Sequence, residues 1–131
     1  MQLSLQPVLE DFISAFEAVN LRSLGIFIDF FAVDISYQDP FHSIRGQDSL
    51  HEMFLHRIEN YDAVRYKVID FAWGRRDGTV YIVWEVMKSG KFIAEVIMEL
   101  CIPPDSKVIS CKEFWSANHP LDQKTYSRAI F

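Results

Sequence analysis

Cysteine is scarce in this chain of 131 residues, which has only Cys101 and Cys111. Neither lies in a Cys-x-x-Cys pair or at a spacing from histidine that is typical of metal ligands. On the predicted strands the two side chains point to opposite faces of the sheet, so a disulfide between them is not expected. The sequence therefore predicts no disulfide, no bound metal and no cofactor.

Long hydrophobic runs are also missing. The most apolar stretch, "LGIFIDFF", is far shorter than the ~20 residues of a membrane-spanning helix and includes Asp29. The first residues, "MQLSLQPVLEDF", lack the positive charge and the long apolar core of a secretory signal. We therefore expect a soluble, cytoplasmic protein without a membrane partner.

An excess of positive charge is absent too, because 13 Lys and Arg face 18 Asp and Glu, for a net charge of -5. Such a surface is poorly suited to phosphate backbones, so nucleic acid is not an expected partner. Half of the residues are hydrophobic and 15% are aromatic, which is typical of a globular protein. The length suits one domain, residues 1–131, with a core over about 6–117 and an irregular tail over 118–131.

Hydrophobic periodicity predicts three helices followed by a sheet. Apolar residues at steps of three and four indicate helices over 6–20, over 21–32 and from Gly46 to residue 60. Asp39-Pro40 ends a short strand, because a residue before proline favours extended geometry. Four longer strands follow, separated by turn-forming residues, over 64–74, 79–88, 91–102 and 107–117. This order predicts an α+β fold with helices packed on one face of a curved, mostly antiparallel sheet.

Alternation along the predicted strands indicates which side chains face the helices. In 91–102 the uniformly apolar set is expected to face inward: Phe92, Ala94, Val96, Met98 and Leu100. In 107–117 polarity leaves the choice open, since each alternating set has one aromatic and one charged residue. The opposite face carries Ile93, Ile97 and Phe114, and an exposed apolar face of this kind predicts a two-fold homodimer through the sheet.

The stretches "YQDPFHSIRG", "GKFIAEVIMEL" and "KEFW", in this order of elements, resemble the nuclear-transport-factor-two-like superfamily. Its members include ketosteroid isomerases, SnoaL-like polyketide cyclases and limonene-epoxide hydrolases, which share a cone-shaped, cystatin-like fold. The resemblance covers about residues 6–117. It indicates the fold more specifically than the chemistry, because one fold hosts many functions.

The resemblance implies a pocket inside the cone with Asp39 as the general base of a ketosteroid isomerase. It also implies that Trp115 lines that pocket, so that Ile109, Cys111 and Glu113 face inward with it, as Ile82, Trp84 and Val86 do from the strand 79–88. The residues expected to bind a small hydrophobic molecule are Tyr37, Phe54, Trp84, Met98, Cys111 and Trp115.

The chain departs from the isomerase pattern at the oxyanion hole. The two positions that supply a tyrosine and a protonated aspartate in those enzymes correspond to Ala15 or Phe16 and to Met98. None of these side chains can donate a hydrogen bond to an enolate, and the loss of one such donor costs about 3 to 4 kcal/mol. A steroid isomerase activity is therefore not expected.

Three candidate catalytic residues remain, each with a structural alternative. Asp39 is a general base or a strand-end residue that accepts backbone hydrogen bonds. Glu113 forms an acid–base pair with Asp39 or, with the other strand register, lies on the surface or at a dimer contact. His42 relays protons from Asp39 or is a solvated loop residue.

Two functions follow from these alternatives. One is an isomerase- or cyclase-type enzyme that uses Asp39, with Glu113 or His42, on a small hydrophobic molecule. The other is a noncatalytic domain that binds an apolar ligand or forms a dimer which recruits another protein.

Overall fold

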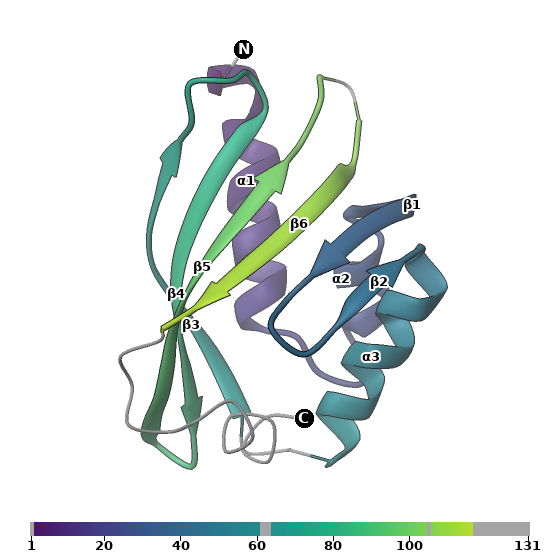
Figure 1. Cartoon of the computed structure of the whole chain (residues 1–131), viewed down its shortest axis with the longest axis vertical. Coiled ribbons are helices and arrows are strands. Elements are labelled where there is room, and N and C mark those ends of the chain that lie inside the picture. The colour runs from purple at the N-terminus through teal and green to yellow at the C-terminus, as the bar shows by residue number, and fades with distance from the viewer. Residues whose placement is uncertain (1, 61–63, 105, 117–131) are drawn as a thin grey trace.

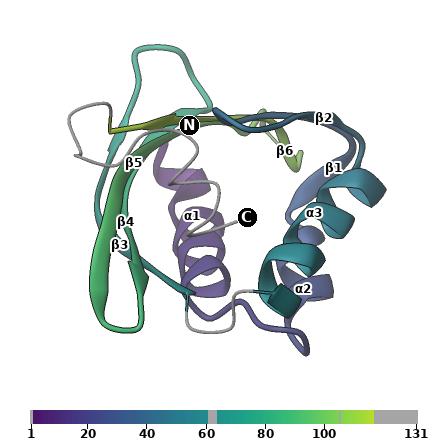
Figure 2. The ribbon, with the colours of Figure 1, turned by 60° about the horizontal axis from the view of Figure 1, so that its bottom comes forward.

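The computed structural model describes residues 2–60, 64–104 and 106–116. Figure 1 shows a single sheet with helices on one side of it, and in Figure 2 the sheet bends around the first helix. This arrangement is the cone-like α+β fold that the sequence predicts. The division into one domain stays a prediction, and the predicted tail, 118–131, lies outside the described residues.

The helices are α1 (Gln2–Glu17), α2 (Leu24–Ile28) and α3 (Gln47–Asn60). In α1 the buried side chains Leu9, Phe12 and Phe16 lie at steps of three and four, so one face of the helix packs against the sheet. The helix α3 packs on α2 and on the first strand. The described helices do not include one that is both long and apolar enough to cross a membrane.

Six strands form the sheet, in the order β2-β1-β6-β5-β4-β3. Neighbouring strands are antiparallel except β1 and β6, which are parallel. In chain order their bounds are β1 (Phe31–Gln38), β2 (Ser43–Arg45), β3 (Val64–Trp73), β4 (Thr79–Lys88), β5 (Lys91–Cys101) and β6 (Val108–Trp115).

The prediction of a helix over 21–32 was wrong in extent. Only Leu24–Ile28 is helical, and the chain is already extended at Phe31, which pairs with Val108 in the sheet. The run is apolar on every side, so its residues are buried equally well as a helix or as a strand and periodicity does not separate the two. The short strand β2 is absent from the prediction because its three residues carry no such signal.

Two irregularities in the sheet overturn part of the predicted alternation. Val86 pairs with Ala94 but the next residue, Met87, pairs with Phe92, so an extra residue in β5 turns Phe92 outward, with 44% of its surface exposed. The ladder between β1 and β6 also shifts in register, and Ile109 is exposed rather than inward. The remaining inward assignments are confirmed, since these side chains are buried: Ile82, Trp84, Val86, Ala94, Val96, Met98, Leu100, Cys111 and Glu113.

Candidate functional site

Parallel pairing of β1 with β6 brings the two candidate carboxylates together. The last paired positions are Gln38 and Lys112, and they are followed directly by Asp39 and Glu113. Both side chains are buried, which is rare for carboxylates without polar partners. Their proximity therefore follows from the strand register and not from their distance along the chain.

Asp39 is held by donors from its own turn. Its Oδ2 accepts a hydrogen bond of 2.8 Å from the Tyr37 hydroxyl, and its Oδ1 accepts from the amides of Phe41 and His42 at 2.8 and 2.6 Å. The His42 Nδ1 lies 3.1 Å from Oδ1, so the imidazole ring also meets this carboxyl. The local backbone hydrogen bonds of the strand-end alternative are thus present, whereas the role of Asp39 as general base stays a prediction.

Arg57 from α3 is the cation of this cluster, and only 1% of its surface is exposed. Its Nη1 donates to the Tyr66 hydroxyl at 3.0 Å, and its Nη2 lies 3.8 Å from Oδ2 of Asp39. The guanidinium carbon is 4.9 Å from the centre of the Phe54 ring, within the range of a cation–π contact. We call Tyr37, Asp39, Arg57, Tyr66 and Glu113 the polar centre.

Burial dominates the electrostatics of Glu113. It raises the pKa of this carboxyl from its ordinary 4.5 to about 7, and the negative charge of Asp39 acts in the same direction. The charge of Arg57, the nearby Tyr37 hydroxyl and the hydrogen bond from Trp115 lower the pKa but do not cancel the effect of burial. Tyr37 has one hydroxyl proton, and its 2.8 Å contact assigns that proton mainly to Asp39. Glu113 is therefore a carboxyl that gains and loses a proton near neutral pH.

The two oxygens of Glu113 differ in their surroundings. Oε1 accepts from the Trp115 indole at 3.4 Å, a long hydrogen bond. Oε2 is buried and has no hydrogen-bond partner among the described residues. A buried oxygen without a partner is costly, so this atom suits a water molecule or a polar group of a ligand.

The other predicted site residues surround the polar centre in different ways. His42 is partly exposed, with 28% of its side chain accessible, and forms the edge of the cluster toward solvent. Trp115 is half-buried, and its ring meets those of Phe41 and Trp84 edge to face. The remaining predicted ligand-binding residues are buried in the core: Tyr37, Phe54, Trp84, Met98 and Cys111. Their role in binding stays a prediction.

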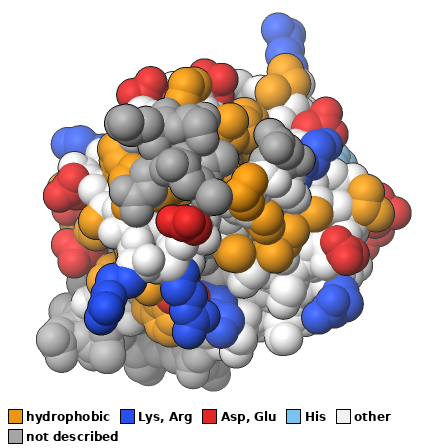
Figure 3. Space-filling model, turned by 90° about the horizontal axis from the view of Figure 1, so that it is seen from above, with side chains coloured by type: hydrophobic (Ala, Val, Ile, Leu, Met, Phe, Trp, Pro, Cys, Tyr) orange, Lys and Arg blue, Asp and Glu red, His pale blue; other side chains and the backbone are white. Residues whose placement is uncertain are grey.

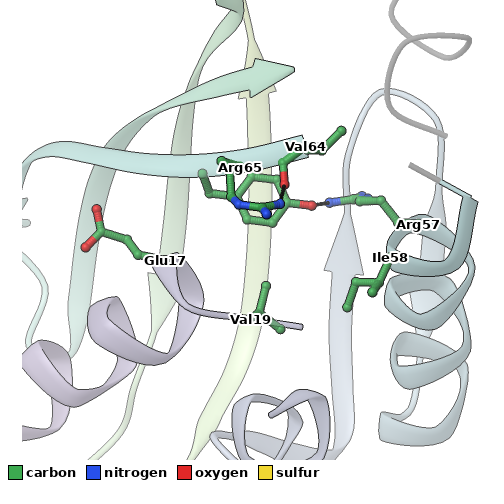
Figure 4. Close-up of a pocket in the computed structure, with 7 residues that line it drawn as sticks. Glu17, Val19, Arg57, Ile58, Val64 and Arg65 are labelled. Atoms are coloured by element: carbon green, nitrogen blue, oxygen red, sulfur yellow. Dashed lines mark hydrogen bonds between the residues drawn. The ribbon is translucent and has the colours of Figure 1, made fainter. Parts of the chain in front are cut away.

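A groove of about 400 Å³ lies where β1 and β6 separate, and both carboxylate residues are among those that line it. The Asp39 side chain exposes no surface, so this residue contributes main chain to the groove. On the other side of the polar centre, a hollow of about 20 Å³ meets Arg57 and Tyr66, and Figure 4 shows the hydrogen bond that joins them. The described residues include no group of three or more His, Cys, Asp or Glu side chains that could hold a metal ion.

Arg57 and Tyr66 are missing from the sequence-based site. The signal for Arg57 was available, because this residue lies three and four positions after Phe54 and Met53 on the apolar stripe of α3. A charged residue at such a position needs a buried partner. Tyr66 lies at an inward position of β3, where an aromatic side chain is also expected for packing alone.

Neither a protein-family model nor a curated protein sequence matches the chain. Solved structures do match it, among them a SnoaL-like protein of unknown function from Burkholderia thailandensis e264, with a TM-score of 0.72 and 14% identity, over 89% of this chain and 98% of that one. An NTF2-like protein of unknown function from Exiguobacterium sp. 255-15 matches with a TM-score of 0.71 and 12% identity, over 84% and 98% of the two chains.

The chain has the NTF2-like fold. This fold is also present in SalBIII, an epoxide hydrolase/cyclase-like enzyme in pyran ring formation in polyether salinomycin, which matches with a TM-score of 0.70 and 12% identity, over 88% and 93% of the two chains. Other neighbours are described as having a cystatin-like fold, which agrees with the predicted fold class. The NTF2-like fold of this chain thus surrounds a cluster of Asp39, Arg57 and Glu113. The fold alone does not determine the chemistry of this cluster.

The ion pair between Asp39 and Arg57 is expected to stabilise the folded protein. Asp39→Asn removes the anion beside the buried Arg57, and we expect the free energy of unfolding to fall by about 3 kcal/mol. Urea denaturation at pH 5 is the suitable measurement, because at that pH Glu113, with its pKa of about 7, is mostly neutral and does not replace the lost charge.

Asp34→Asn is the matched control, because Asp34 lies on the same strand with an exposed side chain. This change should stay within about 0.5 kcal/mol of the wild type. Equal, small losses for both variants would show that Asp39 does not stabilise the buried guanidinium.

Proposed function

We propose that this protein binds a small hydrophobic molecule next to the polar centre and transfers a proton on it, as an isomerase- or cyclase-type enzyme. The observation that carries the proposal is Glu113, a buried carboxyl with a pKa of about 7. Proton transfer is most efficient when the pKa of the catalytic group is close to the working pH. A strongly shifted carboxyl beside a second carboxylate is also a common property of catalytic sites.

The geometry favours a division of roles between the two carboxylates. Asp39 accepts hydrogen bonds from Tyr37, Phe41 and His42 and lies beside Arg57, so its position is fixed. Glu113 has a buried Oε2 without a described partner, which leaves it able to exchange a proton with a bound molecule. We therefore assign proton transfer to Glu113 and its orientation to Asp39. The alternative assignment has Asp39 itself as the general base.

The surroundings of the pair fit a cyclase or hydrolase type of reaction better than a steroid isomerisation. Ala15 or Phe16, and Met98, correspond by resemblance to the positions where an isomerase needs hydrogen-bond donors, and none of these side chains can donate one. The Tyr37 hydroxyl donates to Asp39 instead, and the guanidinium of Arg57 lies 3.8 Å from the same carboxylate. The enzyme SalBIII, with the same fold, is an epoxide hydrolase/cyclase-like neighbour.

Glu113→Gln tests this assignment. The amide keeps the size of the side chain but cannot exchange a proton, so we expect kcat to fall at least about 100-fold. The substrate would come from a screen of apolar compounds with carbonyl or epoxide groups, using wild-type turnover as the readout. Binding of that substrate, measured by quenching of tryptophan fluorescence, should remain within about twofold.

The control is Glu95→Gln, an exposed residue of β5, which should leave kcat unchanged. Wild-type kcat in the Glu113→Gln variant would remove Glu113 from the reaction. Tight binding of many compounds without turnover of any would favour the noncatalytic alternative.

A second candidate function, a dimeric binding domain, is favoured by the outer face of the sheet. Val83, Ile97 and Phe114 lie in one row across three strands, and Ile97 and Phe114 expose 42% and 55% of their surface. Exposed apolar side chains also gather between charged ones on the end of the molecule seen in Figure 3. A two-fold contact through the outer row would cover these side chains in both copies.

Light scattering after size exclusion tests the dimer. We expect twice the chain mass of 15.3 kDa at micromolar concentration, and a monomer for Ile97→Lys, because a charge in an apolar contact is not compensated. Ile26→Lys is the control, since Ile26 is the same residue type and is exposed, but lies on α2. A wild-type mass of 15.3 kDa would contradict the proposed dimer.

A further inference from the structure

A larger groove, of about 580 Å³, shares no lining residue with the groove at Asp39 and Glu113. It lies between the connection from α1 to α2, the last turns of α3 and the first residues of β3. Its apolar wall consists of Val19, Leu21, Ile58 and Val64. A volume of this size is in the range of small-molecule sites, which are mostly apolar with a few placed polar groups.

The polar groups of this groove are mainly positive. Arg22 and Arg65 line it and are exposed. The acidic side chain among the lining residues, Glu17, is turned toward β3, where its Oε2 accepts a hydrogen bond of 2.8 Å from the Val68 amide. Two arginines at one groove of a chain with a net charge of -5 create a local positive field that attracts anions.

The floor of the groove leads to the polar centre. A narrow hollow shares five lining residues with the groove and adds Arg57 and Tyr66; the shared residues are Glu17, Val19, Ile58, Val64 and Arg65. Figure 4 shows Arg57 and Ile58 reaching this hollow from α3. The Nη2 of Arg57 is 3.8 Å from Oδ2 of Asp39. The side chain of Arg57 therefore connects the hollow to this carboxylate.

The connection that bears Leu21 and Arg22 is held in place by Asn20. The Asn20 Oδ1 accepts from the amides of Arg22 and Ser23 at 2.8 and 3.0 Å, and the Ser23 hydroxyl accepts from the Asn20 amide at 3.0 Å. The wall and the charge of the groove are therefore present before a ligand binds, which lowers the entropic cost of binding.

We infer that this groove binds an amphipathic carboxylic acid, whose carboxylate lies at Arg22 and Arg65 and whose apolar body lies along Val19, Leu21, Ile58 and Val64. The far end of such a molecule points to Arg57 and Tyr66. Arginine is well suited to this role, because its planar guanidinium matches a carboxylate with two parallel hydrogen bonds. Only the identification of this acid as the substrate rests on the proposed function, whereas its binding does not.

Isothermal titration with three matched amphiphiles tests the inference: decanoate and decyltrimethylammonium below their critical micelle concentrations, and decanol below its solubility limit. Decanoate should bind about tenfold more tightly than decanol, because each partly exposed guanidinium contributes a factor of a few. The cationic amphiphile should bind more weakly than decanol. The double variant Arg22→Gln/Arg65→Gln should bind decanoate no better than decanol.

The control is Arg75→Gln/Arg76→Gln, which changes the net charge by the same amount at the exposed turn between β3 and β4. This variant should bind decanoate as the wild type does. Equal affinity of the wild type for decanoate and decanol, equal losses in the two double variants, or no binding of any amphiphile would overturn the inference.

Titration of Glu113→Gln separates this inference from the proposed function. We expect the variant to bind decanoate normally, because Glu113 does not line the groove. Selective decanoate binding with full turnover in the Glu113→Gln variant would support the ligand class and contradict the catalytic role of Glu113. Absence of decanoate binding would contradict the ligand class and leave proton transfer by Glu113 to its own test.

Discussion

The side chain of Arg57 is almost completely buried, and the contacts at the centre of this protein depend on it. A buried guanidinium needs an anion and polar acceptors around it. Asp39 supplies the charge, and the hydroxyl of Tyr66 accepts a hydrogen bond. These contacts join α3 to the end of β1 and to β3, so one buried cation relates a helix to two distant strands of the sheet. Removal of the anion alone would leave an uncompensated charge in the core, which is the costly case.

Glu113 is the second carboxyl near the same cation, and burial has a different consequence for it. Its pKa is raised from 4.5 to about 7, so the folded protein binds this proton more tightly than the unfolded chain does. The contribution of Glu113 to stability is therefore complete below about pH 4.5 and is lost as the pH rises through 7. Asp39 and Glu113 thus have separate roles, one as a fixed partner of Arg57 and the other as a group that exchanges a proton.

Much of the fold could be predicted from the sequence, because alternation and turn residues are local signals. The inward position of Glu113 came from the family resemblance, because polarity alone left both alternating sets of 107–117 open. Phe92 and Ile109 were assigned to the wrong face, since an irregularity in strand pairing is set by the neighbouring strand and has no local signature. Arg57 was overlooked although it lies on an apolar stripe. Its partner Asp39 is eighteen residues away, and only the packing of α3 on β1 brings the two together.

The most direct test of this account is the titration of Glu113 itself. The side-chain carboxyl carbon can be followed by NMR from pH 4 to 9 in the folded protein and identified by its absence in the Glu113→Gln variant. We expect a midpoint of about 7, because the carboxyl is buried next to a second carboxylate. A midpoint near 4.5, the ordinary value for glutamate, would show that Glu113 is solvated or fully neutralised by Arg57, and would contradict its role in proton transfer.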